Sequence, residues 1–158
     1  MGMVDVLKGL WQYRRVALVH STDSYGDGGA AAFADAADGL LTVTPTVRFL
    51  PDASHFSAQQ AVLKQSAATV FVLYCQISDG SRLLRTAFEQ GLGGPGFLWF
   101  GGDTFADQPQ LWAEDTAMNA NISLRDCVLR GFFALAPTVL GSAEHSAYLA
   151  RRKQLPPT

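Results

Sequence analysis

The sequence has few charged residues, and none of its charge is concentrated in a way that suits nucleic acid. Only 16% of its 158 residues are charged, and the formal net charge is −2. Basic residues are scattered apart from Arg151, Arg152 and Lys153 near the end. Nucleic-acid binding needs a basic patch or stripe, so no nucleic-acid partner is expected. The 48% of hydrophobic residues and the length instead predict one folded domain.

Long hydrophobic runs are also absent. No apolar stretch approaches the roughly 20 residues that cross a bilayer. The first apolar stretch is interrupted by Asp5 and Lys8, so it lacks the pattern of a signal peptide. We expect these residues to be soluble, with any membrane link made through other segments. Asn121-Ile122-Ser123 is a glycosylation triplet, which makes Asn121 a candidate for modification and a hint of secretion.

Cysteine is scarce, with only Cys75 and Cys127 in the chain. Cys75 should close the third strand, and Cys127 should precede the fifth, at the opposite end of the sheet. Neighbouring strands are about 4.8 Å apart, and a disulfide needs Cα atoms within about 7 Å. We therefore predict two free, mostly buried thiols.

Sequence patterns of enzymes and metal sites are missing. There is no G-x-S-x-G elbow, no Walker-type loop, and no H-x-x-x-H or C-x-x-C spacing. A phospho-receiver needs an acid at the end of its third strand, where this chain has Tyr74-Cys75-Gln76. His20, His55 and His145 share no spacing. We expect no catalytic residues, no metal and no cofactor.

What the chain does contain is alternation between apolar runs and helical patterns. The runs are rich in Val, Leu and Phe, and three are nearly continuous, which is typical of strands covered on both faces. The predicted strands are Arg15–His20, Leu41–Phe49, Thr69–Cys75, Gly96–Gly101 and Val128–Ala134. The pattern predicts an α/β three-layer sandwich with a mainly parallel five-stranded sheet in the order 2-1-3-4-5.

Helices are predicted before, between and after these strands. They are Val4–Tyr13, Gly28–Asp38, Ser57–Gln65, Ser78–Gln90, Gln108–Asp115 and Ser142–Gln154. Asp52 or Ser54 would cap the third helix, and Ser78 or Asp79 the fourth. Residues 1–158 then form a single α/β lobe.

The segment after the first strand is the first candidate for chemistry. The polar loop Ser21–Tyr25 follows a buried strand, and such loops present ligand groups in α/β domains. Gly26-x-Gly28-x-x-Ala31 fits a dinucleotide-binding pattern, with Asp52 near the position of the ribose-binding acid. In that pattern, however, the first glycine follows the strand almost at once, whereas five residues intervene here. A nucleotide-dependent oxidoreductase is therefore the least favoured alternative.

Polar residues follow the first, third and fourth predicted strands, which are neighbours in the proposed order. Their carboxyl ends lie at one rim, so the polar residues should converge there. The candidate ligand-binding residues are Ser21, Asp23, Tyr25, Gln76, Asp103 and Thr104. An acid, a phenol and hydroxyls suit a small ligand with an ammonium group. Two structural alternatives remain open: Asp103 as a helix cap, and Tyr25 as a residue at the edge of the core.

Five segments, in order, resemble the type 1 periplasmic-binding-protein family. They are WQYRRVALVHSTDSYGDGGAAAF, QSAATVFVLYC, LLRTAFEQGLGGPGFLWFGGD, LRGFFALAPT and YLARRKQLPP. The family includes bacterial branched-chain amino-acid binding proteins and the ligand-binding ectodomains of metabotropic glutamate, GABA-B and natriuretic-peptide-type receptors. The resemblance implies one lobe of a Venus flytrap that closes on a small molecule. It covers only the second lobe, with residues 139–158 starting the return crossover.

The resemblance also implies roles for particular residues. In amino-acid receptors of this family, the tyrosine and aspartate that match Tyr25 and Asp103 face the ligand amine. Gly102 stands where the signature usually has serine. The expected function is a ligand-sensing lobe of an extracellular receptor, non-enzymatic, with a first lobe and a receptor dimer as further partners. The alternative is a solute-binding component of a transport system.

Overall fold

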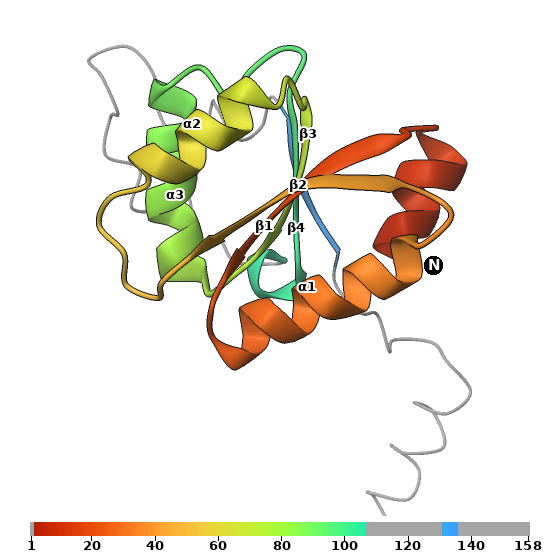
Figure 1. The fold of residues 1–158 in the computed structure, drawn as a ribbon, viewed down its shortest axis with the longest axis horizontal. Helices are drawn as coiled ribbons and strands as arrows, with labels where there is room; N and C mark the ends of the chain where they lie inside the picture. The colour runs from red at the N-terminus through yellow and green to blue at the C-terminus, as the bar shows by residue number, and fades with distance from the viewer. Residues whose placement is uncertain (1, 107–130, 136–158) are drawn as a thin grey trace, which may run out of the picture.

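The computed structural model, which describes residues 2–106 and 131–135, has a parallel sheet at its centre. The strands pair in the order β2-β1-β3-β4-β5, and every pair is parallel (Figure 1). They are β1 (Arg15–Ser21), β2 (Thr42–Phe49), β3 (Val70–Tyr74), β4 (Leu98–Gly101) and β5 (Phe132–Ala134). The predicted α/β class and strand order are confirmed.

Helices cover both faces of this sheet. They are the π-helix η1 (Asp5–Leu10), α1 (Ser24–Ala37), α2 (Ser57–Gln65), α3 (Ile77–Glu89) and the short 3-10 helix η2 (Asp103–Phe105). Helix α1 lies across the sheet from α2 and α3, which pack together on the other face (Figure 1). The predicted helices Gln108–Asp115 and Ser142–Gln154 lie outside the described residues, as do Asn121 and Cys127.

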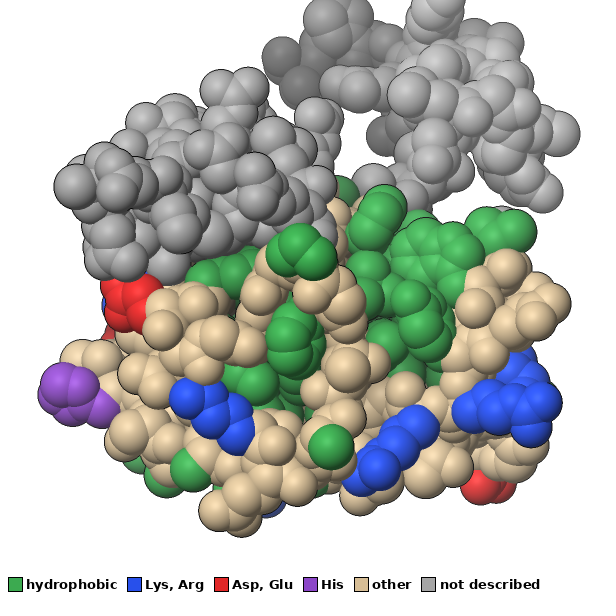
Figure 2. Space-filling model, turned by 90° about the horizontal axis from the view of Figure 1, so that it is seen from above, with side chains coloured by type: hydrophobic (Ala, Val, Ile, Leu, Met, Phe, Trp, Pro, Cys, Tyr) green, Lys and Arg blue, Asp and Glu red, His purple; other side chains and the backbone are tan. Residues whose placement is uncertain are grey.

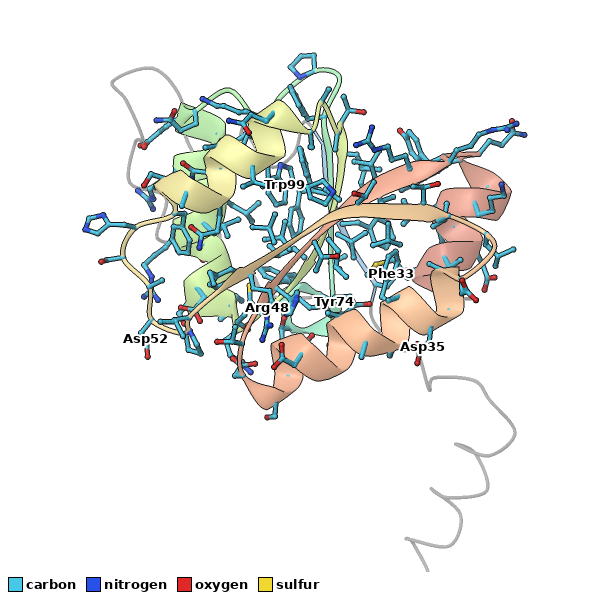
Figure 3. All side chains as sticks on the ribbon, in the orientation of Figure 1. Phe33, Asp35, Arg48, Asp52, Tyr74 and Trp99 are labelled. Atoms are coloured by element: carbon cyan, nitrogen blue, oxygen red, sulfur yellow. The ribbon has the colours of Figure 1, made fainter. Side chains whose placement is uncertain are left out.

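The alternation of side chains along the strands builds two cores. In β1, Val16 and Leu18 join the core beneath α1 and η1, while Ala17 and Val19 join the core beneath α2 and α3. Figure 3 shows Phe33 in the first core and Trp99 in the second. Both faces are covered, which explains why the central strands β1, β3 and β4 are nearly continuous apolar runs.

The start of α1 differs from the prediction. Helix α1 begins at Ser24 rather than Gly28, because Asp23 caps it: its Oδ1 accepts the Gly26 amide at 2.7 Å. The sequence pattern predicts Gly26 before the helix, yet this residue is helical and buried. A Cβ at Gly26 would lie 2.1 Å from the carbonyl oxygen of Ser21. The glycine is therefore required by close packing on the strand end, not by a turn.

The cap predicted for α2 is wrong. The N-cap residue of α2 is Phe56, and it makes no side-chain cap hydrogen bond. Phe56 is buried and packs edge-on against Phe49 of β2, with ring centroids 5.3 Å apart. A hydrophobic anchor, rather than Asp52 or Ser54, fixes where α2 begins.

The caps predicted for α3 are wrong as well. Its N-cap residue is Gln76, again without a side-chain cap bond. Asp79 is buried within the first turn, where its Oδ1 accepts hydrogen bonds from Arg82 and from the Asp52 amide. It therefore ties the β2–α2 loop to α3 rather than capping its own helix.

The strands all begin at one end of the sheet and finish at the other. Figure 2 views the end at which β3 begins, where hydrophobic side chains gather between Lys and Arg side chains. The carboxyl ends of the strands face the opposite way, toward the first turns of α1 and α3 (Figure 1). Within residues 2–106 and 131–135, no helix is long and apolar enough to cross a bilayer.

Candidate functional site

The carboxyl ends of β1, β3 and β4 bring three chain segments together. β3 lies between the other two, pairing His20 with Tyr74 and Leu73 with Gly101. The Gly102 amide continues this ladder by donating to the Leu73 carbonyl at 3.1 Å. As a result, the first turn of α1 lies beside η2, although the two are distant in sequence.

Tyr25 and Asp103 are in direct contact at this rim. The Tyr25 hydroxyl donates to Asp103 Oδ1 at 2.5 Å, across 78 positions of sequence. It also lies 3.4 Å from Thr104 Oγ1, and Thr104 in turn donates to the Cys75 carbonyl at 3.0 Å. We call Tyr25 and Asp103 the rim pair. Of the six predicted site residues, the structure brings these two and Thr104 together.

The rim pair combines a partly buried phenol with an exposed carboxylate. Burial, and secondarily the hydrogen bond to Asp103, raise the pKa of Tyr25 above its ordinary value of 10.0. The phenol is therefore neutral at physiological pH and can donate to Asp103 while its lone pairs accept. A carboxylate and a phenol oxygen side by side provide two acceptors for the N–H groups of an ammonium ion.

Tyr74 supports the rim pair from below, a role that the sequence did not reveal. Its ring centroid lies 6.5 Å from that of Tyr25 in an edge-on arrangement. A Cβ at Gly29 would lie 2.4 Å from the Tyr74 ring, and one at Gly102 would lie 3.1 Å from it. Burial raises the pKa of Tyr74 to about 12. In the sequence, this role of Tyr74 is indicated only by Gly29 and Gly102, whose lack of a side chain leaves room for the ring.

The other three predicted site residues have different surroundings. Ser21 is fully buried, and its Oγ has no hydrogen-bond partner among the described residues. Asp23 caps α1 through the Gly26 amide, and Gln76 is exposed at the start of α3. Contact of these three with a ligand stays a prediction.

The glycines of the dinucleotide-like pattern serve packing. Gly26 and Gly29 allow α1 to approach Ser21 and Tyr74, while Gly28 faces open space. The amino end of α1, where a pyrophosphate would bind, is occupied by the Asp23 carboxylate. A second negative charge there is unfavourable, so this geometry does not favour a nucleotide.

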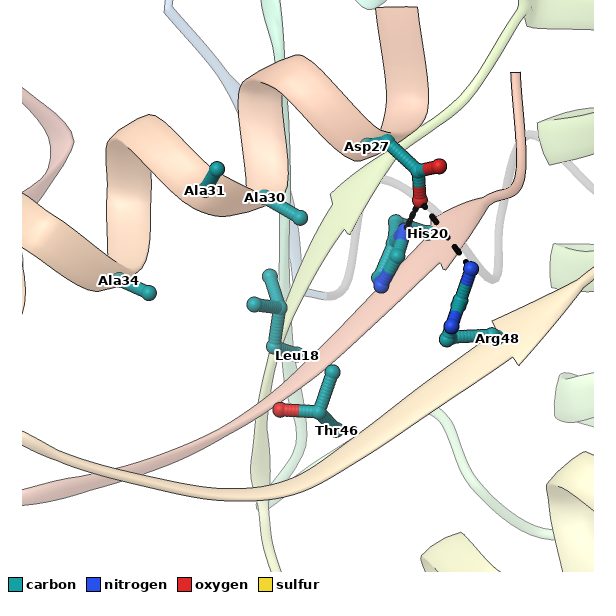
Figure 4. A pocket seen from close by; sticks show the side chains of 8 residues that line it. All are labelled: Leu18, His20, Asp27, Ala30, Ala31, Ala34, Thr46 and Arg48. Atoms are coloured by element: carbon teal, nitrogen blue, oxygen red, sulfur yellow. Dashed lines mark ion pairs between the residues drawn. The ribbon is translucent and has the colours of Figure 1, made fainter. Parts of the chain in front are cut away.

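A separate groove of about 380 Å³ runs between α1 and the edge strand β2 (Figure 4). The buried His20 lies in it, with Nδ1 3.2 Å from Asp27 Oδ1 and 3.0 Å from the Ser21 carbonyl oxygen. Arg48 approaches the same Asp27 oxygen at 3.7 Å. None of the six predicted site residues lines this groove. These contacts of Nδ1 with Asp27 and Ser21 are typical of a buried histidine that has a structural role.

Metal ligation and disulfide bonding find no support in the part of the chain that the structure describes. No group of three or more His, Cys, Asp or Glu side chains there could hold a metal ion. Cys75 is free and buried, as predicted, and burial raises the pKa of its thiol.

Comparison with known proteins shows which family this chain belongs to. Residues 1–147 match the model of the receptor family ligand binding region. A solved structure from Rhodospirillum rubrum, described as a branched-chain amino acid ABC transporter, is similar with a TM-score of 0.69 and 17% sequence identity. The match covers 98% of this chain and 42% of that one, so this chain spans less than half of that protein's length. Comparison with curated proteins finds no match. The family match covers nearly the whole chain, and the chain therefore belongs to the receptor family ligand binding region.

Proposed function

We propose that this chain is the second lobe of a two-lobed extracellular receptor domain, and that it binds a small molecule with an ammonium group, such as an amino acid. The ligand lies between the lobes, and binding favours the closed arrangement of the two lobes. The function is non-enzymatic. The membership in a family of ligand-binding regions supports the class of function.

The observation that carries the proposed ligand class is the rim pair itself. Tyr25 and Asp103 come from α1 and η2, which are brought together only by the fold. The carboxylate is exposed, so an incoming ammonium group can reach it without displacing the core. Hydrogen bonds to a charged group contribute about 1.5–3 kcal/mol each, enough to discriminate an amine from a neutral analogue.

Calorimetric titration of the standard amino acids into the two-lobed domain that contains this chain tests this proposal. At least one amino acid should bind, and Asp103→Asn should weaken its binding because the variant removes the negative charge at the same volume. Asp35→Asn is the matched control, since Asp35 is an exposed acid of α1 outside the rim pair (Figure 3). If no amino acid binds, or if Asp103→Asn binds as tightly as the control, the proposed ligand class is wrong.

A solute-binding component of a transport system is the second candidate. The similar solved structure from Rhodospirillum rubrum is described as a branched-chain amino acid ABC transporter, which favours this alternative. The coding sequence beyond residue 158 distinguishes the two. A membrane-spanning segment there supports the receptor, whereas a stop codon soon after the return to the first lobe supports transport.

A further inference from the structure

The groove between α1 and β2 has a polar end and an apolar end (Figure 4). His20, Asp27 and Arg48 line the polar end, close to where β1 and β2 finish. Leu18 of β1 lies at the apolar end, together with small side chains of α1, namely Ala30, Ala31 and Ala34. The volume of about 380 Å³ is in the range of pockets that hold small molecules. The shape and lining therefore suit a ligand with a polar head and an aliphatic tail.

His20 presents an unpaired ring nitrogen to this groove. Its side chain is only 6% exposed, and its Nδ1 lies 3.2 Å from Asp27 Oδ1 and 3.0 Å from the Ser21 carbonyl oxygen. Both oxygens are acceptors, so the ring proton lies on Nδ1. The other nitrogen, Nε2, makes no hydrogen bond to any described residue and points away from Asp27 into the groove (Figure 4). The head of a ligand can therefore donate a hydrogen bond to Nε2.

The charges at the polar end favour a neutral head. The same Asp27 oxygen contacts both His20 and the Arg48 guanidinium, so the carboxylate and the guanidinium of the groove compensate each other. A charged head would add an uncompensated charge to a partly buried site, which is costly. Arg48 is 61% exposed and lies 3.7 Å from Asp27, so it keeps N–H donors for a ligand oxygen. A hydroxyl meets both requirements, because one oxygen can donate to His20 and accept from Arg48.

We propose that the groove between α1 and β2 is a second binding site, separate from the rim pair, and that it takes a small neutral alcohol with an aliphatic tail. The hydroxyl of the ligand donates to His20 Nε2 and accepts from Arg48. The tail covers Leu18 and the alanines of α1, where each buried methylene adds to the binding free energy. Neither member of the rim pair lines the groove, so this inference does not depend on the proposed function.

Ligands that share a tail and differ in their heads test the role of His20. Hexanol, its isomer pentyl methyl ether, hexanoate and hexylamine are titrated into the two-lobed domain that contains this chain, and binding is followed by ligand-observed NMR. The ether keeps an acceptor oxygen but has no O–H group, so it should bind about tenfold more weakly than hexanol. The two charged ligands should also bind more weakly. Equal or tighter binding of the ether or of either charged ligand overturns the proposal.

Two leucine substitutions on α1 test the location of the site. Ala34→Leu fills the apolar end of the groove and should lower the affinity for hexanol by about tenfold or more. Ala36→Leu is the matched control, because it makes the same change at an exposed position of the same helix that does not line the groove. It should bind hexanol as the unaltered domain does. Equal affinities in the two variants, or no binding of hexanol to the unaltered domain, overturn the proposal and leave the proposed function of the rim pair standing.

Discussion

The hydroxyl of Tyr25 lies 2.5 Å from Oδ1 of Asp103, although the two residues follow β1 and β4, which are not neighbours in the sheet. Strand β3 separates them, and Tyr74 at its end fills the space beneath. The contact exists because parallel strands end at one rim, where the following turns converge. Two glycines leave room around this contact: a Cβ at Gly102 would lie 2.7 Å from the Tyr25 hydroxyl oxygen, and one at Gly29 would lie 2.4 Å from the Tyr74 ring.

The close packing of α1 on β1 predicts opposite effects at two glycines of one helix. Gly26→Ala should destabilise the fold by about 3 kcal/mol, because its Cβ would meet the backbone oxygen of Ser21 at 2.1 Å. Gly28→Ala should stabilise it by about 0.5–1 kcal/mol, because a Cβ there meets nothing and alanine favours a helix. Urea unfolding measures both. Similar effects at the two positions would contradict the packing described for α1.

The buried carboxylate of Asp79 predicts a loss of stability when its charge is removed. Asp79→Asn weakens the bonds to Arg82 and to the Asp52 amide, and should cost about 2–3 kcal/mol. Asp52→Asn is the control: the Asp52 side chain is almost fully exposed and lies 3.6 Å from Arg82. Its loss should cost less than about 1 kcal/mol. Chemical denaturation measures the free energy of unfolding of both variants. A larger loss in Asp52→Asn than in Asp79→Asn would contradict the role described for Asp79.

The raised pKa of Tyr74 predicts a fall in stability at high pH. The folded state holds the phenol proton more tightly than the unfolded chain, whose tyrosines ionise near pH 10. The resulting stabilisation is complete below about pH 10 and is lost as the pH rises toward about 12. Partial exposure limits the effect to at most about 2 kcal/mol. Unfolding free energies measured from pH 8 upward should decline less in Tyr74→Phe; identical declines would show that Tyr74 is not the group responsible.

Burial of Cys75 predicts a thiol that does not react in the folded protein. Burial raises its pKa, so little thiolate forms at pH 8. In a Cys127→Ser background, a thiol-specific disulfide reagent should modify Cys75 only after denaturant is added. Fast modification of the native protein would show that the site is open to solvent.

The architecture was accessible to sequence reasoning because both faces of the sheet are covered. Nearly continuous apolar runs such as 70–74 then mark the strands, and the helices between them require parallel pairing. The start of α1 could not be predicted from the sequence. Position 26 must be glycine because Ser21 packs against it, and Ser21 lies there only in the folded chain.

The site was predicted only in part, because some of its residues stand in polar turns and others in apolar strands. Tyr25 and Asp103 stand in polar turns, where their chemistry is visible in the sequence. Tyr74 belongs to an apolar run, and its role depends on two glycines that face it from α1 and β4's end. The groove containing His20 lies between α1 and the edge strand β2. Local sequence patterns do not show that these two elements lie side by side.

The most direct test of the central claim uses the two-lobed domain that contains this chain. It measures by calorimetry the affinity of Asp103→Asn, beside the Asp35→Asn control, for the amino acid that binds best to the unaltered domain. Loss of the charged acceptor should weaken binding by about tenfold or more, while the control binds normally. Equal affinity in the two variants would contradict the assignment of the rim pair as the amine site.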